Sequence, residues 1–273
     1  MYLDRAKQLV FSAVGECITD QYVYVNPAGK SAKENVIAYT RESVETWQGG
    51  IDIIASHLSE LVEHVYVTTQ SQPVIKRRFV HKPFMTKVFQ EVEHQDSPEL
   101  SELPTAHPAV IADFGHGFLR LWKKWPVWYA VTCQSNSLNW GFNPATKWVA
   151  PNYIVLDTYE AQLALQSRVA PRDAALMLRD RMHAGTVVVT MGHEGAVMAD
   201  DLGATSVVSM SQRPLDRMGA GDAFLAWSAP LAYLKAPAEL IGLFGAAAAA
   251  VKVETAGNGR FTLDRVLERL KAH

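Results

Sequence analysis

The stretch Asp216-Arg217-Met218-Gly219-Ala220-Gly221-Asp222-Ala223-Phe224 joins a glycine-containing loop to an apolar run, residues 223–229, that favours a helix. Glycines allow tight backbone turns in which several N–H groups point at one place. At a helix start, free N–H groups and the positive end of the helix dipole favour an anion. An ionised Asp222 could accept a proton from an attacking hydroxyl while these N–H groups hold the charge of a transferred phosphoryl. The alternative is a simply capped helix start, in which Asp222 bonds its own backbone.

Outside this stretch, short β-branched runs alternate with amphipathic segments. The apolar run 186–190 is typical of a strand buried on both faces, as in a parallel sheet. The alternation predicts an α/β fold, a three-layer sandwich whose helices cover a mostly parallel sheet. The expected strands are residues 8–14, 65–68, 110–112, 127–132, 153–156 and 186–191, and the expected helices are residues 52–62, 171–182, 222–233 and 238–253.

Two regions break this rhythm, with apolar and charged residues alternating and little helical period. They lie at about residues 21–40 and 73–93, and we expect β-ribbons in a small sheet that acts as a lid. Exposed edges of such a lid often pair with a second subunit. Residues 95–108 are acidic, contain three prolines and predict a loop. The simplest organisation is a single domain, residues 1–273, with these two lid segments.

Composition narrows the class of protein and its partners. Of 273 residues, 48% are hydrophobic and 20% charged, which is typical of a globular chain with a large core. The net charge of −2 and the lack of a polybasic block argue against nucleic acid or an anionic membrane as a partner. Cys17 and Cys133 have no metal or redox spacing and favour reduced thiols over a disulfide. With no secretory signal and no apolar run long enough to span a bilayer, we expect a cytoplasmic protein.

The loop at residues 216–224 resembles the signature of the ribokinase (PfkB) family of sugar kinases, and further matches follow in the family's order along nearly the whole chain. The resemblance makes Asp222 the catalytic base in the Gly219-Ala220-Gly221 loop. Asp20, at the end of the first strand, would bind sugar hydroxyls beside the paired glycines Gly49 and Gly50. The resemblance also implies ATP and Mg²⁺ as cofactors. Their predicted contacts are Thr190, Gly192, Gly195 and Asn258 for the nucleotide, and Glu160 and Asp157 for the metal.

Within that family, four stretches look closest to heptose 7-phosphate kinases, including the kinase half of a bifunctional kinase and nucleotidyltransferase: residues 29–34, 76–80, 113–117 and 134–139. Basic residues 76–78 on a lid strand could pair with a substrate phosphate, Arg78 above all, although they could equally be a solvated lid face. Asp113, at a strand's carboxyl end, is a candidate substrate ligand or an ordinary loop carboxylate. His116 and Asn136 are further substrate candidates, with local hydrogen bonding as the alternative.

Some family features are altered. Ile53 stands where an asparagine usually contacts the sugar, Asp157 replaces an asparagine, and residues 116–128 are too few for the usual crossover helix. The sequence therefore predicts phosphorylation of a heptose 7-phosphate or related sugar phosphate at the anomeric oxygen. A catalytically silent sugar-phosphate or nucleotide-binding protein is the alternative. A homodimer through the lid is the expected assembly. A further alternative is an interaction subunit that pairs through its lid with a separate nucleotidyltransferase.

Overall fold

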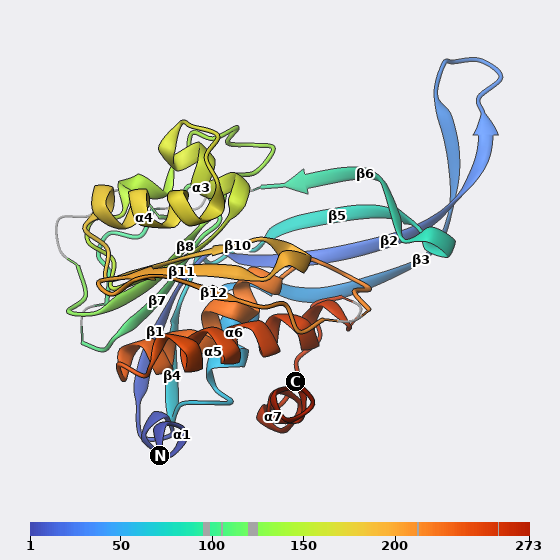
Figure 1. The fold of residues 1–273 in the computed structure, drawn as a ribbon. Helices are drawn as coiled ribbons and strands as arrows, with labels where there is room; N and C mark the ends of the chain where they lie inside the picture. The colour runs from blue at the N-terminus through green and yellow to red at the C-terminus, as the bar shows by residue number, and fades with distance from the viewer. Residues whose placement is uncertain (95–98, 105, 120–124, 212, 256) are drawn as a thin grey trace.

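The structure, a computed structural model, describes residues 1–94, 99–104, 106–119, 125–211, 213–255 and 257–273. Within these residues, eight strands form the main sheet (Figure 1). Strands β1, β4 and β7 to β10 run parallel, and β11 and β12 are antiparallel additions at one edge. In spatial order the strands are β12 (Gly203–Val207), β11 (Ala196–Asp200), β10 (Thr186–Thr190), β9 (Tyr153–Asp157), β8 (Tyr129–Cys133), β7 (Ala109–Asp113), β1 (Val10–Gly15) and β4 (His64–Thr68).

Helices cover both faces of this sheet, as Figure 1 shows. One face packs against α2 (Ile51–Leu58), α5 (Ala220–Tyr233), α6 (Ala238–Val253) and α7 (Leu263–Lys271), with the short α1 (Tyr2–Ala6) at its end. The other face packs against α3 (Thr158–Leu165) and α4 (Pro171–Met182). Every residue of β7 and β8 is buried, as expected for strands covered on both sides. The predicted three-layer α/β fold is confirmed.

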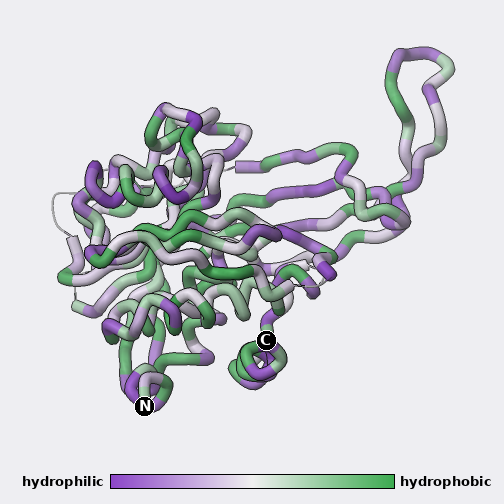
Figure 2. The backbone as a smooth tube through the Cα atoms, in the orientation of Figure 1, coloured by the Kyte–Doolittle hydropathy of each residue, from purple (hydrophilic) through white to green (hydrophobic). Residues whose placement is uncertain are grey.

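A second, four-stranded sheet extends from one end of the main sheet within the described residues (Figure 1). Its order is β3 (Ile37–Gly50), β2 (Cys17–Lys30), β5 (Val74–His81) and β6 (Thr86–Glu93). The ribbons predicted from alternating apolar and charged residues form these strands, and the far part of the β2–β3 hairpin projects beyond them. Figure 2 shows that the main-sheet strands are largely hydrophobic, whereas the lid strands carry many hydrophilic residues. The second sheet thus has little core of its own.

The first strand is shorter than the sequence suggested. Strand β1 ends at Gly15, and β2 begins at Cys17, so Asp20 lies on a lid strand and not at the end of the first strand. The break falls at Glu16, whose buried carboxylate accepts the N–H groups of Phe114 and His116, at 2.9 and 3.1 Å. This carboxylate ties the lid's root to the loop after β7.

Two segments expected to lack regular structure lie partly outside the described residues. The described part of the loop expected at residues 95–108 contains neither helix nor strand. The same holds for the described part of the crossover from β7 to β8. Among the described helices, none is long and apolar enough to cross a membrane.

Candidate active site

A cavity of about 780 Å³ lies where the carboxyl ends of β8, β9 and β10 meet the lid and the start of α5. In open α/β sheets, ligands bind at this edge. The cavity unites much of the predicted set from segments far apart in the chain. The predicted residues that line it are Asp20, Gly50, Arg78, Asn136, Asp157, Glu160, Thr190, Gly192, Gly195, Gly219, Ala220, Gly221, Asp222 and Asn258.

The loop before α5 is held by one buried carboxylate. Asp216 accepts the N–H groups of Met218 and Gly257, at 3.1 and 3.2 Å, and the hydroxyl of Tyr22 at 2.8 Å. Gly219 follows in the left-handed conformation, with a φ of 73°, and forms the N-cap of α5 without any side-chain cap. The free N–H groups at this helix start therefore face the cavity, an arrangement suited to an anion. We call residues 216–221 the anion loop.

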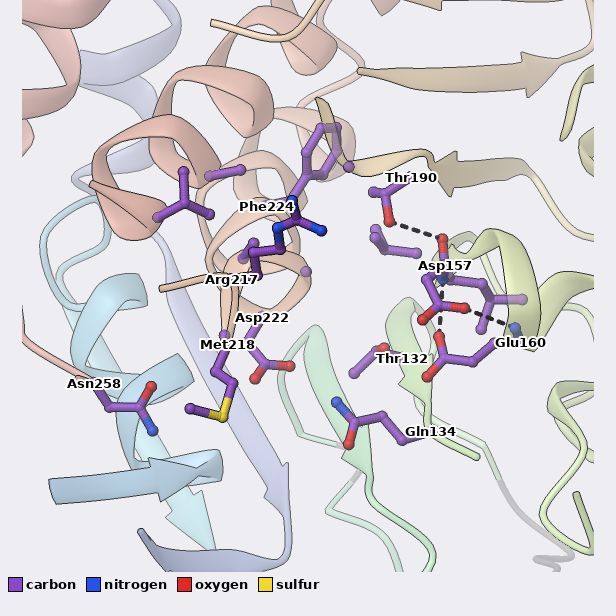
Figure 3. Close-up of a pocket in the computed structure, with 18 of the residues that line it drawn as sticks. Thr132, Gln134, Asp157, Glu160, Thr190, Arg217, Met218, Asp222, Phe224 and Asn258 are labelled. Carbon is purple, nitrogen blue, oxygen red and sulfur yellow. Dashed lines mark hydrogen bonds between the residues drawn. The ribbon is translucent and has the colours of Figure 1, made fainter. Parts of the chain in front are cut away.

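Asp222 lies in the first turn of α5 and points into the cavity between Met218 and Glu160 (Figure 3). Only 9% of the residue is exposed. Burial raises the pKa of Asp222 to about 6, while the cations Lys76 and Lys252 oppose that rise. The carboxylate is thus ionised at neutral pH yet close enough to its pKa to take up a proton, which suits a general base.

An acidic and a basic side chain form an ion pair at the lid end of the cavity. Asp20, 6% exposed, forms an ion pair with Arg78 and accepts the side-chain amide of Asn258 at 2.6 Å. A Cβ on Gly49 would lie 2.6 Å from the Asp20 carboxylate, so this position requires glycine. Gly50 adopts a φ of 63° next to the Glu16 carbonyl and also needs glycine. The paired glycines let the lid strand pass close to Asp20.

The opposite end of the cavity is lined by small and apolar residues. Thr190 is the last residue of β10 and Gly192 follows it in the next turn. Helix α6 contributes the methyl groups of Ala246, Ala249 and Ala250. The Thr190 hydroxyl bonds the Leu156 carbonyl at 3.3 Å, so it is satisfied within the protein. Such a slot, with polar backbone at its rim, has the composition of a site for a flat ring.

Comparison with known proteins agrees with this geometry. Residues 142–264, which include the anion loop, α5 and α6, match the sequence model of the pfkB family of carbohydrate kinases. Among curated proteins, no sequence matches significantly. The family model and the fold described next together support a pfkB family carbohydrate kinase.

Three solved structures share this ribokinase-like fold. Methanocaldococcus jannaschii nucleoside kinase is 17% identical, over 98% of this chain and 100% of its own, with a TM-score of 0.70. Ribokinase from Thermotoga maritima is 15% identical, over 96% and 99%, with a TM-score of 0.73. Phosphofructokinase-2 from Escherichia coli, in complex with potassium, is 15% identical, over 97% and 99%, with a TM-score of 0.71. These names give the heptose specificity no support.

Three predicted substrate-binding residues, Gly49, Asp113 and His116, do not line the cavity. Asp113 is fully buried, and its carboxylate pairs with Lys147 at 2.6 Å and accepts the Trp148 indole N–H at 3.0 Å. Burial lowers the pKa of His116 to about 3, so its ring is neutral, and its backbone N–H is taken by Glu16. The contacts of Asp113 fit its structural alternative. The Nε2 of His116 is buried with no hydrogen-bond partner among the described residues, and neither side chain lines the cavity.

Asn258 also differs from its predicted place. The sequence resemblance put it near the adenine, whereas its side-chain amide donates to the Asp20 carboxylate at 2.6 Å. Figure 3 shows Asn258 at the end of the cavity away from Thr190. It follows the turn at Gly257, which brings residues after α6 back beneath the lid. In this structure Asn258 therefore lies with Asp20, the residue that the sequence resemblance assigned to sugar hydroxyls.

The two predicted metal residues form the capping box of α3. Asp157 accepts the Glu160 N–H at 2.7 Å, and Glu160 accepts the Asp157 N–H at 2.8 Å (Figure 3). Burial and repulsion by Asp157 raise the pKa of Glu160 to about 8. In the described part of the chain, no group of three or more His, Cys, Asp or Glu side chains could hold a metal by itself. Two neighbouring carboxyl groups without a cation partner could contribute to a Mg²⁺ site. Most of the ligands of such an ion would be water molecules and phosphate oxygens.

Two lining or neighbouring residues, Lys87 and Lys252, were missed as site residues, whereas Lys76 is one of the basic residues 76–78 considered as phosphate ligands from the sequence. Lys76 and Lys87 project from lid strands into the cavity, and Lys252 lies behind the anion loop. A signal for Lys252 exists in the sequence: it is the single charge in the otherwise apolar run 246–253. A lysine is rarely fully buried on a helix face unless its charge is paired.

Proposed function

We propose that this pfkB-type kinase transfers the γ-phosphoryl group of ATP to a hydroxyl of a sugar or sugar phosphate. The observation that carries the proposal is the position of Asp222. It is buried beside the anion loop at the start of α5, and it faces the same cavity as the sugar-side carboxylate Asp20. A base and an anion site next to each other are what an in-line phosphoryl transfer requires.

In this mechanism, Asp20 and Asn258 orient the acceptor sugar, and Asp222 takes the proton from its attacking hydroxyl. The N–H groups of Gly219 to Gly221 hold the charge that develops on the transferred group. The adenine would occupy the slot between Thr190 and the alanines of α6. Bound Mg²⁺, near Asp157 and Glu160, would neutralise phosphate charge. The lid above the cavity would exclude water and so suppress ATP hydrolysis.

The lid end of the cavity favours an acceptor that already carries a phosphate. Lys76, Arg78 and Lys87 all line it, and the first two are each only 8% exposed. Asp20 pairs with Arg78 and leaves Lys76 and Lys87 without a carboxylate partner of their own among the described ion pairs. Guanidinium and ammonium groups in a partly dry site bind phosphate oxygens well. Our specific proposal is a heptose 7-phosphate, phosphorylated at the anomeric oxygen.

The lid also supports a proposal about assembly. Strand β3 exposes Ile37, Tyr39 and Val44, and β6 exposes Phe89, which is 61% accessible. We propose that these lid residues pair two copies of the chain in a homodimer, or dock a separate nucleotidyltransferase. A cytoplasmic location agrees with the use of ATP, a cytoplasmic metabolite.

A silent binding protein is the competing function. Ile53 is 3% exposed within α2 and does not line the cavity, so the polar sugar contact expected there is missing. An activity with ATP and Mg²⁺ would exclude this alternative, because a binding protein releases no ADP.

The test is ADP release with ATP and Mg²⁺ across heptose 7-phosphates, fructose 6-phosphate, ribose and adenosine, each beside Asp222→Asn. We expect turnover with a phosphorylated sugar and a fall in kcat of roughly 10²- to 10⁴-fold in the variant, since a general base contributes about that much. ATP binding by the variant, followed by calorimetry, should persist. No turnover with any acceptor, together with sugar-phosphate binding, would establish the silent binding protein.

A further inference from the structure

Lys252 is a buried cation without a hydrogen bond. It lies in the last turn of α6 and is 1% exposed. Its ammonium group has no hydrogen-bond partner in the described parts of the chain. The helix's negative end favours a cation at this position, yet the loss of hydration remains costly. A protein that keeps such a group needs it for something other than packing.

The ammonium group lies directly behind the anion loop. A Cβ on Gly219 would be 3.1 Å from the Lys252 Cε and 4.0 Å from its Nζ. The same Cβ would be 3.2 Å from the Asn258 side-chain oxygen, which is also buried and has no hydrogen-bond partner among the described residues. A donor without a partner, the Lys252 ammonium group, and an acceptor without a partner, the Asn258 oxygen, therefore both lie close to Gly219 in the anion loop.

The charges around Lys252 are mostly negative. Burial lowers its pKa, whereas Asp216, Asp222 and Asp20 act in the opposite direction. Lys252 in turn opposes ionisation of the His57 ring on α2. Around Asp222, the facing charged groups are Lys76 on β5, Asp20 on β2, Glu160 on α3 and Lys252 on α6. Lys252 is thus the cation that the folded core supplies, while Lys76 comes from the lid.

We propose that Lys252 is a positioning residue that provides a permanent positive charge behind the anion loop, acting through Asp216 and Gly219. The charge holds the loop in its anion-binding form and favours ionised Asp222 during phosphoryl transfer. The site needs no mobile cation at this point, because the ammonium group is covalently attached to α6. This inference rests on the proposed kinase activity.

The test compares Lys252→Met, Lys252→Arg and Lys252→Ala with the wild-type enzyme. Methionine has a similar length and no charge, and replacement of an unpaired buried charge by an apolar group is often neutral or stabilising. We therefore expect Lys252→Met to keep or raise the Tm while its kcat falls about 10- to 100-fold, since the loop's N–H groups remain. The acid limb of its pH–rate profile should move upward, because Asp222 loses a nearby cation. Lys252→Arg should retain more activity than Lys252→Met.

Lys252→Ala adds a direct test of charge. Alanine leaves space for a small cation, so ammonium chloride should restore part of its kcat, whereas tetramethylammonium chloride at equal ionic strength should not. Lys147→Met is the matched structural control: it leaves buried Asp113 unpaired and should lower the Tm without moving the acid limb.

The outcomes separate this inference from the proposed function. If the wild-type enzyme turns over while Lys252→Met keeps its kcat and pH profile, or loses only Tm, the role of Lys252 is overturned and the kinase assignment stands. If the wild-type enzyme releases no ADP with any acceptor, the proposed function fails, and the Tm of Lys252→Met then decides the structural role alone.

Discussion

Asp222 illustrates how burial and charge together set the chemistry of one residue. Burial alone would make the carboxyl too reluctant to ionise, and Asp20 nearby adds repulsion. Lys76 and Lys252 offset part of this cost. The resulting pKa of Asp222, about 6, lies just below neutral pH. A less buried aspartate would be ionised but a weaker proton acceptor.

This pKa predicts the pH dependence of the reaction. In the proposed mechanism the active form of Asp222 is the ionised one, and its pKa in the folded protein lies above the ordinary value of 3.8, at about 6. We therefore expect kcat/KM to be level above about pH 7 and to fall about tenfold per pH unit below pH 6. The measurement is initial rate against pH with saturating MgATP and limiting acceptor. A profile that stays level down to pH 4.5 would contradict the role of Asp222.

Arg77 and Arg78 are neighbours in sequence with opposite surroundings. Arg78 faces the cavity and pairs with Asp20, whereas Arg77 pairs with Glu91 and Glu93 on the lid surface. The strand alternation that separates them is the ordinary two-residue period. This pair therefore offers a controlled test of substrate class.

Arg78→Gln should raise the KM for a phosphorylated acceptor by about 10- to 100-fold, the usual worth of a hydrogen bond to a charged group. The KM for ATP should stay the same, because Arg78 lies at the lid end of the cavity. Steady-state kinetics with both substrates measure the effect, with Arg77→Gln as the matched control. An equal KM for the phosphorylated acceptor in both variants would remove Arg78 from the site.

At the scale of elements, the sequence predicted best where periodicity was long and uninterrupted. Helices α4 and α6 have the predicted bounds, since α4 is amphipathic over 12 residues and α6 is almost continuously apolar. Strands β11 and β12 were missed because β12 begins with a glycine and lacks a continuous apolar run, and only Asp201 and Leu202 separate it from β11. The capping box of Asp157 and Glu160 was missed as a structural feature because the same residues carried a metal interpretation.

The site was predicted less completely than the fold, for a physical reason. Motifs mark residues by local spacing, and so they predict Asp222 and the anion loop as a candidate site. The partners of Asp20 and Asp113 depend on contacts across 238 and 34 residues of chain, respectively, from Asn258 and Lys147. No local pattern specifies such contacts. The burial of Lys252 likewise follows from helix packing and not from its own neighbours.

The hydroxyl group of Tyr22 joins the lid to the anion loop. Tyr22 on β2 donates to Asp216 at 2.8 Å, and the same carboxylate fixes Met218 and Gly257. Burial, followed by this hydrogen bond, raises the pKa of the Tyr22 phenol, so it remains a donor at all ordinary pH values. A lid strand thus helps to shape the anion loop.

Tyr22→Phe should lower the free energy of unfolding by about 1–3 kcal/mol, because a buried carboxylate loses a donor. It should also lower kcat, since the anion loop is less firmly held. Urea unfolding and steady-state kinetics measure the two effects. Tyr24→Phe is the control: its hydroxyl bonds Glu45 within the lid at 3.1 Å, away from the loop. Equal kcat values for the two variants would show that the lid strand does not support the loop.

At the scale of the whole molecule, the second sheet stands apart from the core. Strand β3 is exposed along residues 37–46, and its hairpin with β2 extends well beyond the main sheet (Figure 1). A long two-stranded ribbon is marginally stable by itself in water. Apolar side chains at Ile37, Tyr39 and Val44 on such a ribbon gain stability if a second surface covers them.

If two copies pair through the lid, then charge on this ribbon should separate them. We expect the wild-type chain to sediment as a dimer at micromolar concentration and Tyr39→Asp/Val44→Asp to sediment as a monomer, because two carboxylates would be desolvated at the interface. Leu202→Asp is the control: Leu202 is 94% exposed in the β11–β12 turn, far from the lid in sequence, and its loss should leave the dimer intact. Since each lid also covers its own cavity, the monomeric variant should show a higher rate of ATP hydrolysis without acceptor. A wild-type chain that remains monomeric at all concentrations, or a double variant that remains dimeric, would place the contact elsewhere and leave the hairpin as a lid alone.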